Sequence, residues 1–229
     1  MKKYIAVCSV LALLVGANVN AQAFQKGNKN IDLGIGFGGY GTTSTFSTTF
    51  NGVTVSSSES DGAASTIIPI GFEYGVGEKI GVGADLFFNN YFINDSDKVV
   101  LEKVSSFDVG GKFNYHLLNA EKNDLYLSLG LGFSNMKWSY QAATANFIES
   151  ASGSGTYFSL GIADRIYFSD HIGISFNLGY RGYNYSNIEA NLSSQAETAL
   201  AAFGVTDYSQ SWTFKMTGVH FGMGLAIKL

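Results

Sequence analysis

Residues 212–229, WTFKMTGVHFGMGLAIKL, alternate between apolar side chains and side chains that are small or polar. Counted back from the end, the apolar residues are Leu229, Ile227, Leu225, Met223, Phe221 and Val219, and between them stand Lys228, Ala226, Gly224, Gly222, His220 and Gly218. Successive side chains of a β-strand point to opposite faces, so this stretch predicts a strand with one apolar and one glycine-rich face. In a transmembrane β-barrel the apolar face meets lipid and the other face lines the interior. The final strand must then pair with the first, because hydrocarbon does not tolerate an open sheet edge.

The composition agrees with such a barrel. The chain has 229 residues, of which 28 are glycine, 18 phenylalanine and 13 tyrosine, and only one is proline. Charged residues make up 14%, below the roughly 25% of an ordinary soluble domain. After the N-terminus the sequence contains no apolar run long enough for a transmembrane helix. Many aromatics, few charges and no apolar helix favour a membrane barrel over a soluble enzyme.

The first residues have the pattern of a secretory signal peptide. Lys2 and Lys3 precede an apolar core over residues 5–15, and small residues follow at Ala21 and Ala23. We expect cleavage after residue 21 or, alternatively, after residue 23, which leaves one barrel domain over residues 22–229. The only cysteine, Cys8, lies inside the signal, so the mature chain has no thiol and no disulfide. It keeps 12 basic and 18 acidic residues, a net charge of −6 that disfavours a nucleic-acid role.

The same alternation recurs along the whole chain and predicts eight antiparallel strands. We expect them near residues 30–40, 66–75, 80–92, 104–118, 125–134, 155–168, 172–181 and 212–229. Asp164 falls on the lipid face of its strand, which requires either a bulge or a place near the rim. Aromatic residues fall at the strand ends, where the girdles of a membrane barrel belong. The expected outer girdle is Tyr40, Tyr91, Trp138, Tyr140, Tyr183 and Trp212, and the expected inner girdle is Tyr74, Tyr115 and Phe168.

Three tight turns alternate with four longer connections, as in barrels with short periplasmic turns and long extracellular loops. The turns are predicted at residues 76–79, 119–124 and 169–171. The longer connections are predicted as an extended hairpin over residues 41–58 and as loops at residues 94–103, 141–152 and 185–211. The first loop contains Asn51-Gly52, a strong hairpin signal flanked by Thr- and Ser-rich arms. In the last loop, Ser194-Gln195-Ala196-Glu197 is a capping box, which predicts a short helix over residues 196–203.

Charged residues of both signs fall on the inward face. The acids are Asp32, Glu73, Asp85 and Asp108, and the bases are Lys112, Arg165, Arg181 and Lys228. An unpaired buried charge is costly, so we expect these groups to form an interior network of ion pairs and hydrogen bonds. His116 and His220 also point inward, and we expect them to join the network, although either could act as an acid, a base or a metal ligand. His171 falls in a turn and is expected to be a solvated surface residue.

At this point the chain resembles the small outer-membrane barrels of the OmpA/OmpX type. The resemblance covers the whole mature chain and rests on its architecture, with one departure: Leu229 stands where such chains usually end in an aromatic residue. It implies an all-β, eight-stranded antiparallel up-and-down barrel in the outer membrane of a Gram-negative cell. It also implies insertion by the barrel assembly machinery, which recognises the last strand.

The function expected from these patterns is structural, with surface interaction through the extracellular loops and little or no conductance. Two alternatives stay open: a lipid-modifying enzyme, and a carrier of small hydrophobic molecules. The enzyme needs Ser, His and acidic side chains at the outer rim, and no histidine falls near the external loops, so we expect no enzyme and no catalytic residue. We also expect no cofactor and no metal site. The expected partners are outer-membrane lipids, lipopolysaccharide and a possible extracellular partner at the loops, with the chain itself a monomer.

Overall fold

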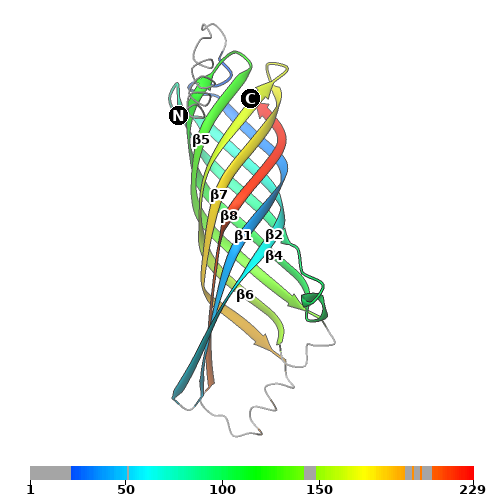
Figure 1. Ribbon diagram of the computed structural model, residues 1–229. Helices are drawn as coiled ribbons and strands as arrows, with labels where there is room; N and C mark the ends of the chain where they lie inside the picture. The colour runs from blue at the N-terminus through cyan, green and yellow to red at the C-terminus, as the bar shows by residue number, and fades with distance from the viewer. Residues whose placement is uncertain (1–21, 51, 142–147, 194–197, 199–201, 203–207) are drawn as a thin grey trace, which may run out of the picture.

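A computed structural model describes residues 22–50, 52–141, 148–193, 198, 202 and 208–229. The expected signal peptide over residues 1–21 lies outside the described residues, as does almost all of the helix expected over residues 196–203. The described strands form one closed antiparallel barrel, in which each strand pairs with the next (Figure 1). The elements are β1 (Lys29–Phe50), β2 (Val53–Gly75), β3 (Ile80–Tyr91), the 3-10 helix η1 (Asp97–Val99), β4 (Leu101–Asn119), β5 (Asn123–Tyr140), β6 (Ile148–Tyr167), β7 (Ile172–Leu192) and β8 (Tyr208–Lys228).

The barrel closes between its first and last strands, as the sequence predicts. β8 pairs with β1 in one unbroken register, from Asn30 opposite Lys228 to Phe50 opposite Tyr208. The apolar residues of β8 point outward: Phe221, Met223 and Val219 are each more than half exposed. Outward apolar side chains on all eight strands make a continuous apolar belt around the barrel. Such a belt needs lipid around it, because water would be a poor solvent for so large an apolar surface.

The strands that leave the membrane on the extracellular side are longer than the sequence predicts. Residues 101–103, 148–152, 185–192 and 208–211, expected in loops, belong to strands. The outward face of these segments lies above the apolar belt and is no longer apolar, while Ala151, Tyr185 and Ile188 on the inward face are buried in the lumen. Alternation marks the part of a strand that crosses the membrane, so it does not detect its extension. The predicted turn over residues 119–124 is likewise shorter, since β5 begins at Asn123.

The first loop is a regular hairpin that continues the barrel wall. β1 and β2 pair up to Phe50 opposite Val53, and Gly52 has the positive φ of +81° that the turn requires. Hydroxyl groups face each other along one side of this arm, in the pairs Thr43–Ser60, Thr45–Ser58, Ser47–Ser56 and Thr49–Thr54 at 2.7–3.5 Å. Figure 1 shows β1, β2 and β8 projecting together beyond the other strands. We call the part of these strands beyond Thr42 the extracellular arm.

Asp164 lies near the periplasmic rim, and no bulge moves it inward. β6 pairs with β5 and β7 without a register shift between Gly155 and Tyr167. Asp164 stands three residues before the end of β6 and accepts a hydrogen bond from Asn123 Nδ2 at 3.2 Å. A carboxylate at this height reaches the polar boundary of the membrane. Of the two explanations left open by the sequence, the structure therefore supports the position near the rim.

No helix among the described residues is long and apolar enough to cross a membrane.

Candidate functional site

The barrel interior holds three layers, and the layer nearest the periplasmic turns is an ion-pair cluster around Arg165. Its guanidinium donates to Asp32 from Nε and Nη2 at 2.9 and 2.7 Å. Nη1 donates to Glu73 at 2.6 Å and to Asp124 at 3.0 Å. The Arg165 side chain is fully buried, and the Tyr126 ring lies against it with its centroid 4.5 Å from Cζ. One cation thus joins carboxylates from β1, β2 and β5 across the lumen.

His116 completes this cluster from β4. Its Nδ1 lies 2.5 Å from Asp124 Oδ1, and its Nε2 lies 3.1 Å from Glu73 Oε1. Asn114 and Asn30 donate further hydrogen bonds to Glu73, so both carboxylate oxygens of this fully buried residue are satisfied. The imidazole is held on both sides by acceptors, an arrangement that fixes its orientation. We call Asp32, Glu73, Asp124, His116 and Arg165 the periplasmic cluster.

The segment before β1 covers this end of the barrel. The Phe24 ring stacks on the His116 imidazole, with centroids 3.4 Å apart, and is itself fully buried. Asn119 holds the Phe24 backbone at both polar atoms, accepting from the amide at 2.8 Å and donating to the carbonyl. The sequence has no strand pattern here and predicts only a short polar tail over residues 25–29 before the first strand. Instead, an apolar side chain from this segment closes the periplasmic end of the lumen.

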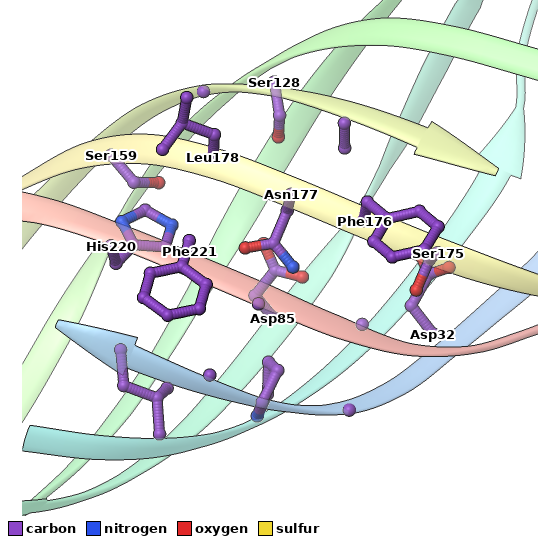
Figure 2. A pocket seen from close by; sticks show the side chains of 18 of the residues that line it. Asp32, Asp85, Ser128, Ser159, Ser175, Phe176, Asn177, Leu178, His220 and Phe221 are labelled. Atoms are coloured by element: carbon purple, nitrogen blue, oxygen red, sulfur yellow. The ribbon is translucent and has the colours of Figure 1, made fainter.

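The middle layer is a cavity of about 110 Å³ between the two ends (Figure 2). Its lining includes Asp32 of the periplasmic cluster on one side and Arg181 on the other. Lys112 Nζ forms an ion pair with Asp85 at 2.8 Å in the cavity wall. Several lining positions are glycines, which leave the space unfilled: Gly34, Gly36, Gly71, Gly161 and Gly222. The cavity is large enough for several water molecules or one small ligand.

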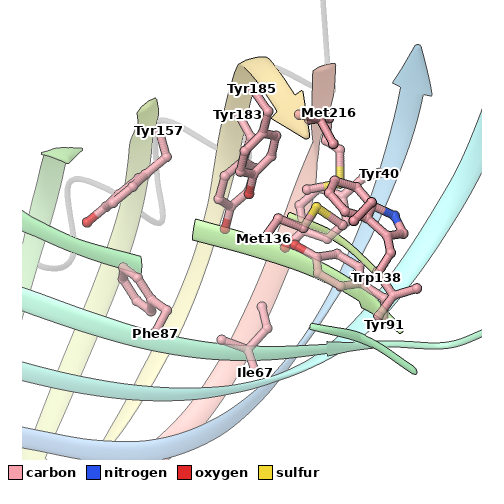
Figure 3. Packing of buried hydrophobic residues seen from close by; sticks show 13 residues of the cluster. Tyr40, Ile67, Phe87, Tyr91, Met136, Trp138, Tyr157, Tyr183, Tyr185 and Met216 are labelled. Atoms are coloured by element: carbon pink, nitrogen blue, oxygen red, sulfur yellow. The ribbon is translucent and has the colours of Figure 1, made fainter. Parts of the chain in front are cut away.

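The third layer, toward the extracellular side, is a dense aromatic cluster (Figure 3). Its buried members are Tyr40, Ile67, Phe87, Tyr91, Val104, Met136, Trp138, Ala151, Tyr157, Tyr183, Tyr185, Ile188 and Met216. We call this set the aromatic plug. Rings from different walls of the barrel meet in it, such as Tyr40 and Tyr183, whose centroids are 6.1 Å apart. Side chains from all eight strands thus fill the lumen at this level.

The aromatic plug overturns the predicted outer girdle. Tyr40, Tyr91, Trp138 and Tyr183 point into the barrel and are at most 8% exposed. Tyr140 and Trp212 are partly buried against the same cluster. These residues point inward because each stands an even number of positions from inward-facing residues of its own strand, and side chains alternate between the two faces of a strand. The residues of the predicted inner girdle do face outward: Tyr74, Tyr115 and Phe168 are exposed on the outer wall.

Two charged residues are embedded in the aromatic plug. Asp108 accepts hydrogen bonds from Tyr183 Oη at 2.9 Å and from Ser134 Oγ and Asn89 Nδ2. Arg181 donates to Tyr183 Oη at 3.2 Å, and its guanidinium lies over the Phe87 ring at 3.8 Å. Tyr183 therefore links the cation to the carboxylate. The two opposite charges are thus connected through Tyr183 inside a low-dielectric layer, while Arg181 Nε has no hydrogen-bond partner among the described residues.

The structure brings together most of the predicted interior network. Asp32, Glu73, Arg165 and His116 meet in the periplasmic cluster, Asp85 pairs with Lys112, and Asp108 is linked to Arg181. Lys228 makes no ion pair within the described residues and instead lies over the Tyr167 ring at 4.9 Å. The prediction for His220 is wrong, because its buried Nδ1 has no hydrogen-bond partner among the described residues. His220 lies in the cavity wall instead (Figure 2).

Asp124 was not predicted to face the lumen, because the sequence places it in the turn over residues 119–124. The alternation of β5 extends one residue pair further than the predicted strand start, and Tyr126 and Asp124 share the inward face. The inward alternation of Tyr126 could therefore have predicted that Asp124 faces the lumen. His171 is exposed in the turn before β7, as predicted, and its Nδ1 lies 2.9 Å from the Lys228 carbonyl. Within the described residues, no group of three or more His, Cys, Asp or Glu side chains is arranged to hold a metal ion.

Comparison with known proteins shows the fold. No family model matches the sequence, and no curated protein matches it. Among solved structures, the outer membrane protein OprG from Pseudomonas aeruginosa is 14% identical, with a TM-score of 0.63 over 92% of this chain and 99% of that one. Ail of Yersinia pestis is 14% identical and covers 86% of this chain and 99% of its own, with a TM-score of 0.37. The outer membrane protease OmpT of Escherichia coli is 10% identical, covers 88% and 97%, and has a TM-score of 0.42.

The strand order and the apolar belt also show a membrane β-barrel fold. The chain has the fold of the small outer-membrane β-barrels of the OmpA/OmpX type, with eight antiparallel strands. A closed barrel with an apolar exterior crosses a membrane. Its location is the outer membrane.

Proposed function

We propose that this outer-membrane barrel is a non-conducting structural protein whose extracellular arm and loops make its surface interactions. One observation supports the lack of conductance above all others: charged and aromatic layers occupy the lumen at both ends of the cavity. An ion would have to pass the aromatic plug, then the cavity, and then the periplasmic cluster behind Phe24. Eight strands leave an interior only wide enough for side chains or one small ligand.

Planar-bilayer recording tests this proposal. Purified protein should give no steady conductance step. A variant with a thinned plug and an uncovered periplasmic end, Tyr157→Ala with Tyr183→Ala and Phe24→Ala, should give a measurable one. The matched control is Phe88→Ala with Phe107→Ala, which removes two aromatic rings from the outer wall. Large and reproducible steps from the unmodified protein would contradict a closed interior.

Surface interaction is the part of the proposal that concerns the extracellular arm. Functional residues concentrate in segments that are not needed to hold the scaffold together. The β2 strand of the arm is exposed, and the hydroxyl groups paired between β1 and β2 form a polar surface beyond the membrane. This geometry fits a polar extracellular partner better than a lipid-modifying active site. We accordingly propose no enzymatic activity, and a monomer inserted by the barrel assembly machinery.

A second function, the transport of small hydrophobic molecules, has one observation in its favour. Pro69, the only proline of the chain, lies in the middle of β2 and lines the cavity. The pairing of β1 with β2 skips two residues at this level, between Leu33 opposite Ile70 and Gly36 opposite Ile67. A proline has no backbone N–H to donate, so the wall is weaker there. If the carrier function is right, cells producing the protein should take up a fluorescent naphthylamine faster than cells without it.

A further inference from the structure

A groove of about 340 Å³ lies on the outer wall of β3, β4 and β5, where these strands leave the apolar belt. Phe88 and Phe107 contribute its apolar part, and their rings pack together with centroids 5.0 Å apart. Lys103 and Lys137 line the groove beyond these rings. Both lysines are exposed, and no Asp or Glu is among the lining residues.

The strand register fixes the height of the groove. Phe88 pairs with Phe107, the last outward apolar residues of β3 and β4 below the groove. One step further along the strands, Ser105 of β4 stands opposite Lys137 of β5, and Lys103 stands opposite Ser139. Lys137 thus stands level with a residue two positions, or about 7 Å, beyond Phe107, and Lys103 stands four positions, or about 14 Å along the tilted strand, beyond it, so the ammonium groups reach the layer above the belt. That layer is the lipid headgroup region on the extracellular side.

The two lysines are also close to each other and free of acidic partners among the described residues. They occupy a diagonal cross-strand position, with Cα atoms roughly 7–8 Å apart by the general geometry of a sheet. Neither forms an ion pair with a described carboxylate. Two unneutralised ammonium groups over an apolar floor are complementary to a molecule with a phosphate at one end and acyl chains at the other. Asn90, Ser105 and Asn135 add neutral hydrogen-bond donors at the same level.

We propose that this groove is a binding site for a phosphorylated lipid headgroup of the outer leaflet, with Lys103 and Lys137 holding the phosphate of lipopolysaccharide. Lysine binds phosphate as a compact point charge, and its attraction to anionic lipid adds up per residue. Phe88 and Phe107 contact the upper part of the acyl chains. The proposal rests on the location in the outer membrane, and it does not depend on whether the lumen conducts.

Native mass spectrometry of the full-length mature barrel in detergent tests this site, with bisphosphorylated lipid A as the probe. The test variant is Lys103→Gln with Lys137→Gln. The matched control is Lys215→Gln, an exposed outward lysine of β8 that pairs with Thr43 and Asn184 on another wall. Losing two interfacial charges should weaken lipid A binding roughly tenfold to thirtyfold. The control should bind within about twofold of the unmodified protein, since it keeps both groove lysines.

Two further probes separate the sources of phosphate. Lipid A without phosphate should bind the unmodified barrel as weakly as bisphosphorylated lipid A binds the double variant. Inorganic phosphate should not displace bisphosphorylated lipid A at millimolar concentration, because it lacks the acyl chains. Equal binding by the double variant and the unmodified protein would overturn the proposal, as would an equal loss in Lys215→Gln or displacement by inorganic phosphate. A heat-dependent shift on a denaturing gel confirms that each variant is folded.

Discussion

Arg165 on β6 and Asp32 on β1 are joined by two parallel hydrogen bonds, Nε to Oδ1 at 2.9 Å and Nη2 to Oδ2 at 2.7 Å. These strands are not neighbours in the barrel wall, because β1 pairs with β2 and β8 while β6 pairs with β5 and β7. The pair therefore crosses the lumen and links opposite walls. A bidentate guanidinium–carboxylate contact has a defined geometry, so it fixes the distance between those walls.

Removing Arg165 should destabilise the barrel strongly. In Arg165→Met the carboxylates of Glu73 and Asp124 remain fully buried and that of Asp32 partly buried, and within the cluster only His116 remains to compensate them. Breaking one side of a buried ion cluster costs about 3–5 kcal/mol. Urea unfolding of the barrel in detergent micelles, followed by tryptophan fluorescence, measures the loss.

The control for this prediction is the compensated variant Arg165→Met with Asp32→Asn and Glu73→Gln. It removes charge from both sides and should recover a large part of the lost stability, since neighbouring substitutions are not additive. The same logic applies to Arg181→Met alone against Arg181→Met with Asp108→Asn. Equal destabilisation by the single and the compensated variants would show that packing, and not charge, dominates the cluster.

Gly83 should tolerate no side chain. A Cβ added to it would collide with the carbonyl oxygen of Phe72 on the paired strand β2. Backbone cannot give way as the end of a flexible side chain can, so Gly83→Ala should cost about 1–3 kcal/mol of unfolding free energy. Gly39→Ala is the matched control, because nothing lies within 4 Å of its added Cβ. Unfolding both variants side by side measures the difference, and equal stability would contradict the close approach.

The barrel wall could be predicted from the sequence because its rule is local. In the membrane-crossing part of a strand, each residue's odd or even position decides whether it faces lipid or the lumen. The apolar alternation over Leu125–Phe133 and Val219–Leu229 repeats this pattern many times. Inward charges such as Glu73 and Arg165 follow from the same rule. Lipid solvates one face of the strand everywhere in the belt, so packing partners do not alter the pattern.

Contacts across the lumen could not be predicted in the same way. Parity places Arg165 inside but does not say which carboxylates it meets, because that depends on the register and tilt of strands far apart in the sequence. Phe24 has no strand pattern at all, and its place under His116 is a property of the closed barrel. Above the membrane the apolar face ends, so the hairpin of the extracellular arm was predicted from Asn51-Gly52 and its Thr- and Ser-rich arms, and the structure confirms it.

Shortening the extracellular arm should leave the barrel intact. Replacing residues 46–57 by Asn-Gly joins Thr45 to Ser58 through a two-residue turn at positions that already pair. The deleted residues that the structure describes are largely exposed, apart from the contact of Phe46 with Trp212, whose ring centroids are 5.3 Å apart. Membrane insertion and the heat-dependent gel shift should therefore persist. If surface interaction belongs to the arm, binding to host or neighbouring cells should fall in the same variant.

The outcome that would contradict this view is loss of insertion. The arm would then be part of the folding unit, and the pairing of β1 with both β2 and β8 beyond Thr42 would be needed to close the barrel. A shortened arm that inserts normally but still supports all surface binding would assign the interaction to the other loops instead.

The N-terminal end of the mature chain should affect stability, because the two expected cleavage sites leave different contacts. Cleavage after residue 21 keeps Ala23, which is fully buried and donates its amide to the Ala120 carbonyl at 2.7 Å. Cleavage after residue 23 removes that bond and turns the amide of Phe24, buried against Asn119, into a charged ammonium group. A lost hydrogen bond and a buried charge should together lower the free energy of unfolding by about 1–3 kcal/mol. Refolding chains that begin at Gln22 and at Phe24 and unfolding both in urea measures this difference, and equal stability would mean that Phe24 alone closes the periplasmic end.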